Sequence, residues 1–76
     1  MIEIMSKEEL FKKIGLKIRT LREEKKLSIQ EFSDIINIEY NNLIRIEKGR
    51  TNPTIGTLYK VCQALNVRVI DIVDVE

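Results

Sequence analysis

The chain lacks histidine and tryptophan and has only one cysteine and one proline among its 76 residues. Without histidine, and with Cys62 as the only thiol, it shows no residue spacing typical of a metal site or a catalytic centre. A single cysteine cannot form an internal disulfide, and it suits a reducing compartment. The composition therefore predicts a cytoplasmic protein that is not an enzyme and needs no cofactor or metal.

Long hydrophobic runs are absent as well. No stretch of about 18 apolar residues occurs, so no membrane span is predicted. Residues 1–5 have neither the basic start nor the long apolar core of a signal peptide. The length suits a single domain over residues 1–76. Folding at this size buries only about 60–65% of the unfolded surface, so a partner subunit would add stability.

The chain has no large excess of charge of one sign. Its net charge is only +1, but the basic and acidic residues are unevenly distributed along it. Residues 7–68 contain 13 basic and 8 acidic side chains, which gives this span a net charge of +5. The remaining acidic residues lie in the two tails and are Glu3, Asp71, Asp74 and Glu76. A basic body fits a surface that faces phosphate, although charged helix faces are often only solvated.

Apolar residues at helical spacing predict a first helix. Ser6 followed by Glu9 is a capping box that opens it, and the pattern runs to about Lys25. Gly15 lies inside this pattern, where glycine costs up to about 1 kcal/mol, so it indicates a close crossing by another helix. The apolar stripe consists of Leu10, Phe11, Ile14, Ile18 and Leu21.

Residues 28–49 carry two shorter helical patterns separated by about four residues. The first begins at a capping box of Ser28 with Glu31 and ends near Asn37, a residue that tolerates the left-handed conformation. The second covers residues 40–48 and is followed by a glycine that ends it. The residues expected to face the core are Phe32, Ile35, Ile36, Leu43 and Ile46. This is the layout of a helix-turn-helix, in which one helix braces the next in the major groove of DNA.

A fourth helix is predicted after the polar loop of residues 50–53. Thr54 can cap it, and its buried face consists of Leu58, Val61, Cys62 and Leu65. Residues 67–75 fit a short helix from about Val69, or a strand that could pair with residues 1–5, because many of them are β-branched. We favour the helix. The sequence thus predicts an all-α domain of five helices with tails at residues 1–5 and 74–76, and short terminal β-strands are the alternative for its two ends.

Several of these segments match one known family when they are taken as a set. They are Ile14-Gly15…Ile18-Arg19…Leu21-Arg22, Leu27-Ser28…Glu31-Phe32, Arg45-Ile46-Glu47-Lys48-Gly49 and Asn52-Pro53-Thr54…Leu58…Ala64-Leu65-Asn66-Val67. From Ile14 to about Val73 the chain resembles the Cro and phage-repressor type of helix-turn-helix, also called the XRE family. The resemblance implies a compact lambda-repressor-like fold and a DNA-binding function.

The resemblance also implies roles for individual residues. In the family, the Arg and Glu that match Arg22 and Glu47 form an ion pair between the first and third helices. The exposed side of the third helix enters the major groove, where Asn can bond an adenine edge and Arg a guanine edge. The base-reading residues would be Tyr40, Asn41, Asn42 and Arg45. Phosphate contacts would come from Lys17, Ser28, Gln30, Lys48, Arg50, Thr51 and Asn52.

Two residues depart from the family pattern. Ile29 stands where the family usually has a Gln that grips a phosphate, and Glu39 stands where Ser or Thr is common. Glu39 suits the positive end of the helix dipole but would repel a nearby phosphate.

Together these features predict a sequence-specific DNA-binding transcriptional regulator of the repressor or restriction–modification controller type. Its expected partners are double-stranded DNA and a second copy on a palindromic operator, with no membrane and no small-molecule effector. Ile70, Ile72 and Val75 would form the dimer interface or close the core. The alternative is an antitoxin or another protein-interaction module that uses the same fold.

Overall fold

A computed structural model describes residues 5–74, and within this range the chain forms five helices and no strand. The helices are α1 (Lys7–Glu24), α2 (Ile29–Ile36), α3 (Tyr40–Glu47), α4 (Ile55–Leu65) and α5 (Val69–Val73). The predicted all-α architecture is confirmed, and the ambiguous tail is helical. The strand considered for residues 1–5 falls almost wholly outside the described residues. No helix in the described range is long and apolar enough to cross a membrane.

The helix boundaries follow from local hydrogen bonds. The hydroxyls of Ser6, Ser28 and Thr54 each accept a bond from the backbone N–H three residues later, at 3.0–3.1 Å. Ser28 also donates its own N–H to the Glu31 carboxylate at 2.9 Å, which completes the predicted capping box. At the other ends, four helices are followed by a residue in the left-handed region. These residues are Lys26, Asn37, Gly49 and Asn66, with φ of 59°, 55°, 72° and 57°.

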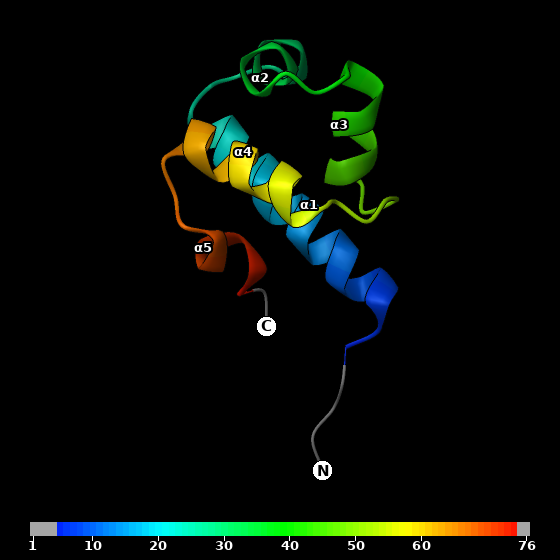
Figure 1. Cartoon of the computed structure of the whole chain (residues 1–76). Helices are drawn as coiled ribbons and strands as arrows, with labels where there is room; N and C mark the ends of the chain where they lie inside the picture. The colour runs from blue at the N-terminus through cyan, green and yellow to red at the C-terminus, as the bar shows by residue number, and fades with distance from the viewer. Residues whose placement is uncertain (1–4, 75–76) are drawn as a thin grey trace.

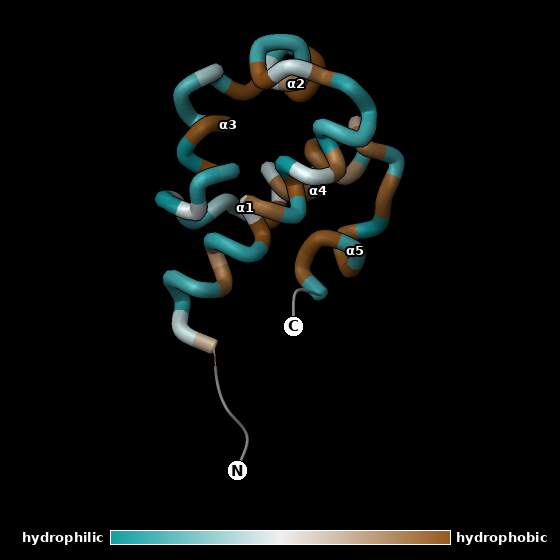
Figure 2. Tube along the Cα trace, turned by 180° about the vertical axis from the view of Figure 1, so that it is seen from behind, coloured by the Kyte–Doolittle hydropathy of each residue, from teal (hydrophilic) through white to brown (hydrophobic). Residues whose placement is uncertain are grey.

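Helix α1 is the central element of the fold. It packs against α3, α4 and α5, while α2 packs against α3 and α4. Figure 1 shows α3 and α5 on different sides of α1, with α4 crossing it. The hydrophobic segments of all five helices, seen in Figure 2, supply the core. Its buried apolar residues are Ile14, Ile18, Phe32, Ile36, Leu43, Ile46, Leu58, Val61, Cys62, Leu65 and Ile72.

The prediction for α2 was wrong at one position. Ile35 is 57% exposed, and Ser33 is buried in its place. At 100° per residue the buried side of α2 runs from Phe32 through Ile36 to Ser33, which leaves Ile35 beyond its edge. The Ser33 hydroxyl donates to the carbonyl of Gln30 at 2.9 Å, so burial leaves it satisfied.

The residues suggested for a dimer interface occupy different environments. Ile72 has no exposed surface, so it closes the core and offers nothing to a partner. Ile70, on the same short helix, remains 56% exposed. Val75 lies outside the described residues.

Gly15 marks the close helix crossing that its place in the pattern indicated. A Cβ added there would lie 2.6 Å from the carbonyl oxygen of Glu47 and closer still to that of Ile46. The crossing is therefore between α1 and α3. The backbone of α3 lies directly against the backbone of α1 at Gly15, where no side chain separates them. Gly49, just past α3, touches α1 in the same manner at Lys12.

Gly15→Ala should lower the free energy of unfolding by about 1–3 kcal/mol or more, because α1 and α3 must separate to admit the methyl group. Gly56→Ala is the matched control. A Cβ at Gly56 meets only the Thr54 hydroxyl at 3.7 Å, so helix propensity should raise stability by up to about 1 kcal/mol. Urea denaturation measures both changes, and equal stability of the two variants would contradict the close crossing.

Candidate nucleic-acid interface

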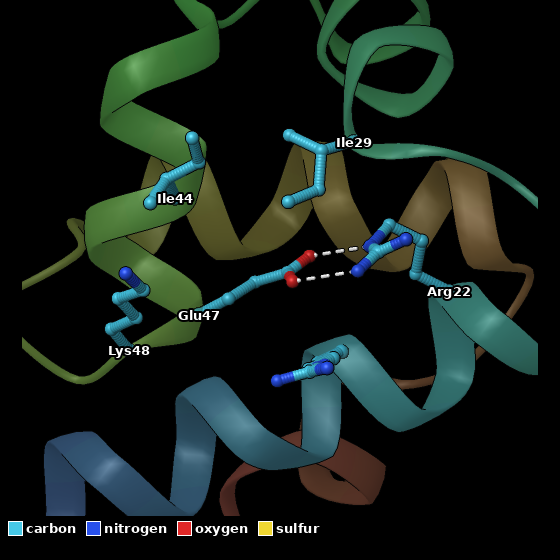
Figure 3. A pocket seen from close by; sticks show the side chains of 6 residues that line it. Arg22, Ile29, Ile44, Glu47 and Lys48 are labelled. Carbon is cyan, nitrogen blue, oxygen red and sulfur yellow. Dashed lines mark hydrogen bonds and ion pairs between the residues drawn. The ribbon is translucent and has the colours of Figure 1, made fainter.

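Arg22 and Glu47 form a buried ion pair that joins α1 to α3. Nε of Arg22 donates to Oε2 of Glu47 at 2.7 Å, and Nη2 donates to Oε1 at 3.0 Å. The two side chains are only 8% and 4% exposed. Nη1 donates to the carbonyl of Leu27 at 2.7 Å, so the same guanidinium also holds the turn before α2. The structure thus brings together the two residues that the family resemblance linked (Figure 3).

The geometry of this pair is the favourable one for a buried charge. Two parallel N–H···O bonds match the fork of a guanidinium to a carboxylate. Bonding to Glu47 raises the pKa of Arg22, against the opposing effect of burial, so the guanidinium remains charged. Because Glu47 is the last residue of α3, the pair fixes that helix relative to α1.

The outer side of α3 carries the residues expected to read bases. Leu43, Ile46 and Glu47 are buried, which turns the opposite side of the helix to solvent. Asn41 and Arg45 are exposed on that side, Tyr40 is 42% exposed, and Asn42 is partly buried. The start of the helix has no side-chain cap, because Glu39 makes no capping bond there. α3 therefore presents short amide and guanidinium groups on a rigid support.

The residues after α3 continue this polar surface. Lys48, Arg50 and Asn52 are exposed and Thr51 is partly buried. The backbone N–H of Arg50 donates to the carbonyl of Arg45 at 2.9 Å, and the N–H of Gly49 donates to that of Ile46 at 3.0 Å. These two bonds close the helix end, so the loop leaves α3 in a fixed direction.

The other predicted phosphate contacts come from α1 and the start of α2. The Ser28 hydroxyl accepts from the backbone N–H of Glu31, the Ser28 N–H donates to the Glu31 carboxylate, and the Gln30 amide donates to Asp34 at 3.0 Å. Lys17 belongs to a different surface, since it lines a hollow with α5 residues such as Ile70, whereas α3 packs elsewhere on α1. Lys17 is therefore not part of the α3 surface.

A cleft with a volume of about 300 Å³ opens between α1, α2 and α3. Ile29 and Ile44 form its apolar wall and lie on the same side of the ion pair in Figure 3. Its full lining is Arg19, Arg22, Ile29, Ile44, Glu47 and Lys48. Arg19 and Ile44 were not predicted as site residues. The sequence signal that could have identified Ile44 is its spacing. Asn41 lies three residues before it and Lys48 four residues after it, so the three side chains share one face of a helix.

Cys62 contributes almost nothing to the surface. It is 3% exposed, and burial raises the pKa of its thiol, as expected for a small core residue. Within residues 5–74 no group of three His, Cys, Asp or Glu side chains is arranged to hold a metal.

Known proteins match both the sequence and the fold. A family model described as helix-turn-helix matches residues 18–72. An uncharacterised HTH-type transcriptional regulator, y4dJ, from Sinorhizobium fredii is 35% identical over 86% of this chain and 84% of its own length. The immunity repressor of Bacillus phage phi105 is 35% identical over 83% of this chain, and the antitoxin PezA of Streptococcus pneumoniae is 37% identical over 79%. The chain spans only 44% of that repressor and 38% of that antitoxin.

A solved structure shows the same arrangement of helices. The clp gene regulator ClgR from Corynebacterium glutamicum superposes with a TM-score of 0.81 at 26% identity, over 86% of this chain and 69% of that one.

Arg22→Ala should lower the free energy of unfolding by about 3–5 kcal/mol, because it leaves the Glu47 carboxylate buried without its partner. A loss of that size is a large part of the total free energy of unfolding expected for a domain this small. Arg19→Ala is the control on the same helix. Its contact with Glu23, at 3.3 Å between side chains more than half exposed, should be worth less than about 1 kcal/mol. Thermal unfolding followed by circular dichroism compares them, and equal melting temperatures would contradict the role of the pair.

Proposed function

Because the chain belongs to the helix-turn-helix family of transcriptional regulators, we propose that it binds a specific two-fold symmetric DNA operator as a homodimer. The observation that carries the proposal is the outer side of α3. It exposes Asn41 and Arg45 on a helix fixed to α1 by a buried ion pair. Exposed amide and guanidinium groups on a rigid helix have the chemistry and the size for direct readout in the major groove.

Each part of this surface has a separate task in the proposed complex. Asn41 bonds an adenine edge and Arg45 a guanine edge, with Tyr40 and Asn42 contacting bases or sugars beside them. Lys48, Arg50, Thr51 and Asn52, which follow α3 directly, hold phosphates and fix the register of the helix in the groove. Transcription is then controlled by occupancy of the operator.

A dimer is part of the proposal because one α3 helix reads only a few base pairs. Two copies related by a two-fold axis would read half-sites about 34 Å apart. The exposed apolar residues of α4 and α5 support such a contact. Because α3 packs on α1 and α2, a dimer formed through α4 and α5 would leave the outer side of α3 free for DNA. These exposed apolar residues are Ile55, Tyr59, Ile70 and Val73.

The charges around Ile70 also suit a second copy. The hollow that Ile70 lines contains both basic and acidic side chains, among them Lys17, Arg68, Asp71 and Asp74. A two-fold contact brings the same patch of both subunits together, so a patch with both signs of charge can complement itself.

A second candidate function is that of an antitoxin, which the likeness to PezA favours. In that case the apolar surface of α4 and α5 would bind a different protein. The oligomeric state of the purified protein distinguishes the two candidates. Self-association through this surface favours the homodimeric regulator, and a monomer favours the antitoxin.

Selection of bound duplexes from a random pool should yield a pseudo-palindrome with half-sites about one helical turn apart. Asn41→Ala should relax the preference at one position in each half-site, at a cost of about 1–3 kcal/mol. Arg50→Ala should instead weaken binding to all sequences alike and reduce the salt dependence by about one phosphate contact. Recovery of no enriched sequence by the wild-type protein would refute the proposal.

Ile70→Lys should convert the dimer to a monomer at concentrations where the wild-type chain is dimeric, because it puts a charged ammonium where the apolar side chains of the two copies would meet. Ile35→Lys on α2 is the matched control, since Ile35 is 57% exposed and Ile70 is 56% exposed. Sedimentation equilibrium distinguishes the two states. An Ile70→Lys protein that stays dimeric would place the dimer contact elsewhere.

A further inference from the structure

Ile29 and Ile44 place an apolar wall directly beside the polar surface of α3. Both side chains are partly buried and line the same cleft, although they come from different helices. On α3, Ile44 shares a helix face with Asn41 before it and Lys48 after it. The apolar wall therefore lies between the residue proposed to read a base and the residue proposed to hold a phosphate.

The edge of the same cleft is cationic. Arg22 and Glu47 on its floor neutralise each other, which leaves the charges of Arg19 and Lys48. Among the described residues, the one ion pair of Arg19 is with the exposed carboxylate of Glu23, a partner that it can exchange at little cost. Lys48 takes part in no ion pair among the residues that the structure describes.

We propose that this cleft binds one sugar–phosphate unit of the DNA backbone. Lys48 and Arg19 hold the phosphate, and the deoxyribose carbons pack against Ile29 and Ile44. In a nucleotide the sugar joins the base to the phosphate, and Asn41, Ile44 and Lys48 follow the same order across α3. The inference rests on the proposed function and adds a subsite to it.

This subsite gives the two isoleucines a role that differs from that of the basic residues. An apolar contact with a sugar strengthens binding to every sequence equally, because each nucleotide carries the same sugar. It also releases no counterions, so its contribution does not change with salt.

The test compares Ile44→Ala and Ile29→Ala with the wild-type chain by fluorescence anisotropy at several salt concentrations. The probes are the selected operator and an unrelated duplex of equal length. Each variant should bind both duplexes roughly four- to fifteen-fold more weakly, since each buried methylene contributes about a four-fold factor. The slope of log affinity against log salt should stay that of the wild type.

Three controls separate this subsite from a structural effect. Ile44→Val should recover most of the loss. Ile35→Ala, an exposed apolar residue of α2 outside the cleft, should bind as the wild type does. Arg19→Ala should reduce the salt slope by about 0.9, the value for one phosphate. Circular dichroism at the assay temperature shows whether each variant is folded.

Wild-type affinity of Ile44→Ala would overturn the inference and leave the proposed function intact. So would a loss confined to sites with thymine at one position that disappears when uracil replaces it, because Ile44 would then read a base methyl group. Absence of DNA binding by the wild-type chain would instead refute the proposed function itself.

Discussion

The buried bond between Arg22 and Glu47 is the interaction on which the position of α3 depends. A charge pair with so little exposure stabilises a fold only when both members are fully hydrogen-bonded, and here the guanidinium bonds the carboxylate twice and the Leu27 carbonyl once. The backbone contact at Gly15 lets the two helices approach closely enough for these bonds to form. The ion pair and the close approach at Gly15 together hold α1, α3 and the turn that leads into α2.

The surface properties follow from this fixed position. Since Glu47 and its neighbours Leu43 and Ile46 point inward, the helix has to direct Asn41 and Arg45 outward. The cation-rich loop after the helix leaves in a direction set by its own backbone bonds. The polar outer side of α3, the basic loop after it and the Ile44 side of the cleft are therefore all positioned by this one short helix.

Much of the fold could be predicted from the sequence because its determinants are local. Capping hydroxyls at Ser6, Ser28 and Thr54 set three helix starts, and apolar spacing set most of the core. Ile35 was misplaced because, in a helix of only eight residues, adjacent apolar side chains leave the direction of the buried face ambiguous. The Arg22–Glu47 contact spans 25 positions, so its identification needed the family resemblance.

The candidate site was predictable only in part, for a related reason. The polar residues of α3 are consecutive or nearly so, and their exposure follows once Leu43 and Ile46 are assigned to the core. The cleft is assembled from α1, α2 and α3, and no local pattern shows that Arg19, Ile29 and Ile44 meet there. The left-handed turn at Lys26 was also missed, because lysine has no special preference for that conformation.

The left-handed turns have a consequence for the unfolded chain. Three of the four use Lys26, Asn37 or Asn66 where glycine would be free of strain. Each side chain costs the native state about 1–2 kcal/mol, and less where it is asparagine, but it also restricts the conformations open to the denatured polypeptide by about 0.4–1 kcal/mol. The restriction of the denatured state therefore offsets part of the strain. The domain can therefore form tight connections between its helices without carrying the extra backbone freedom that three more glycines would give it before folding.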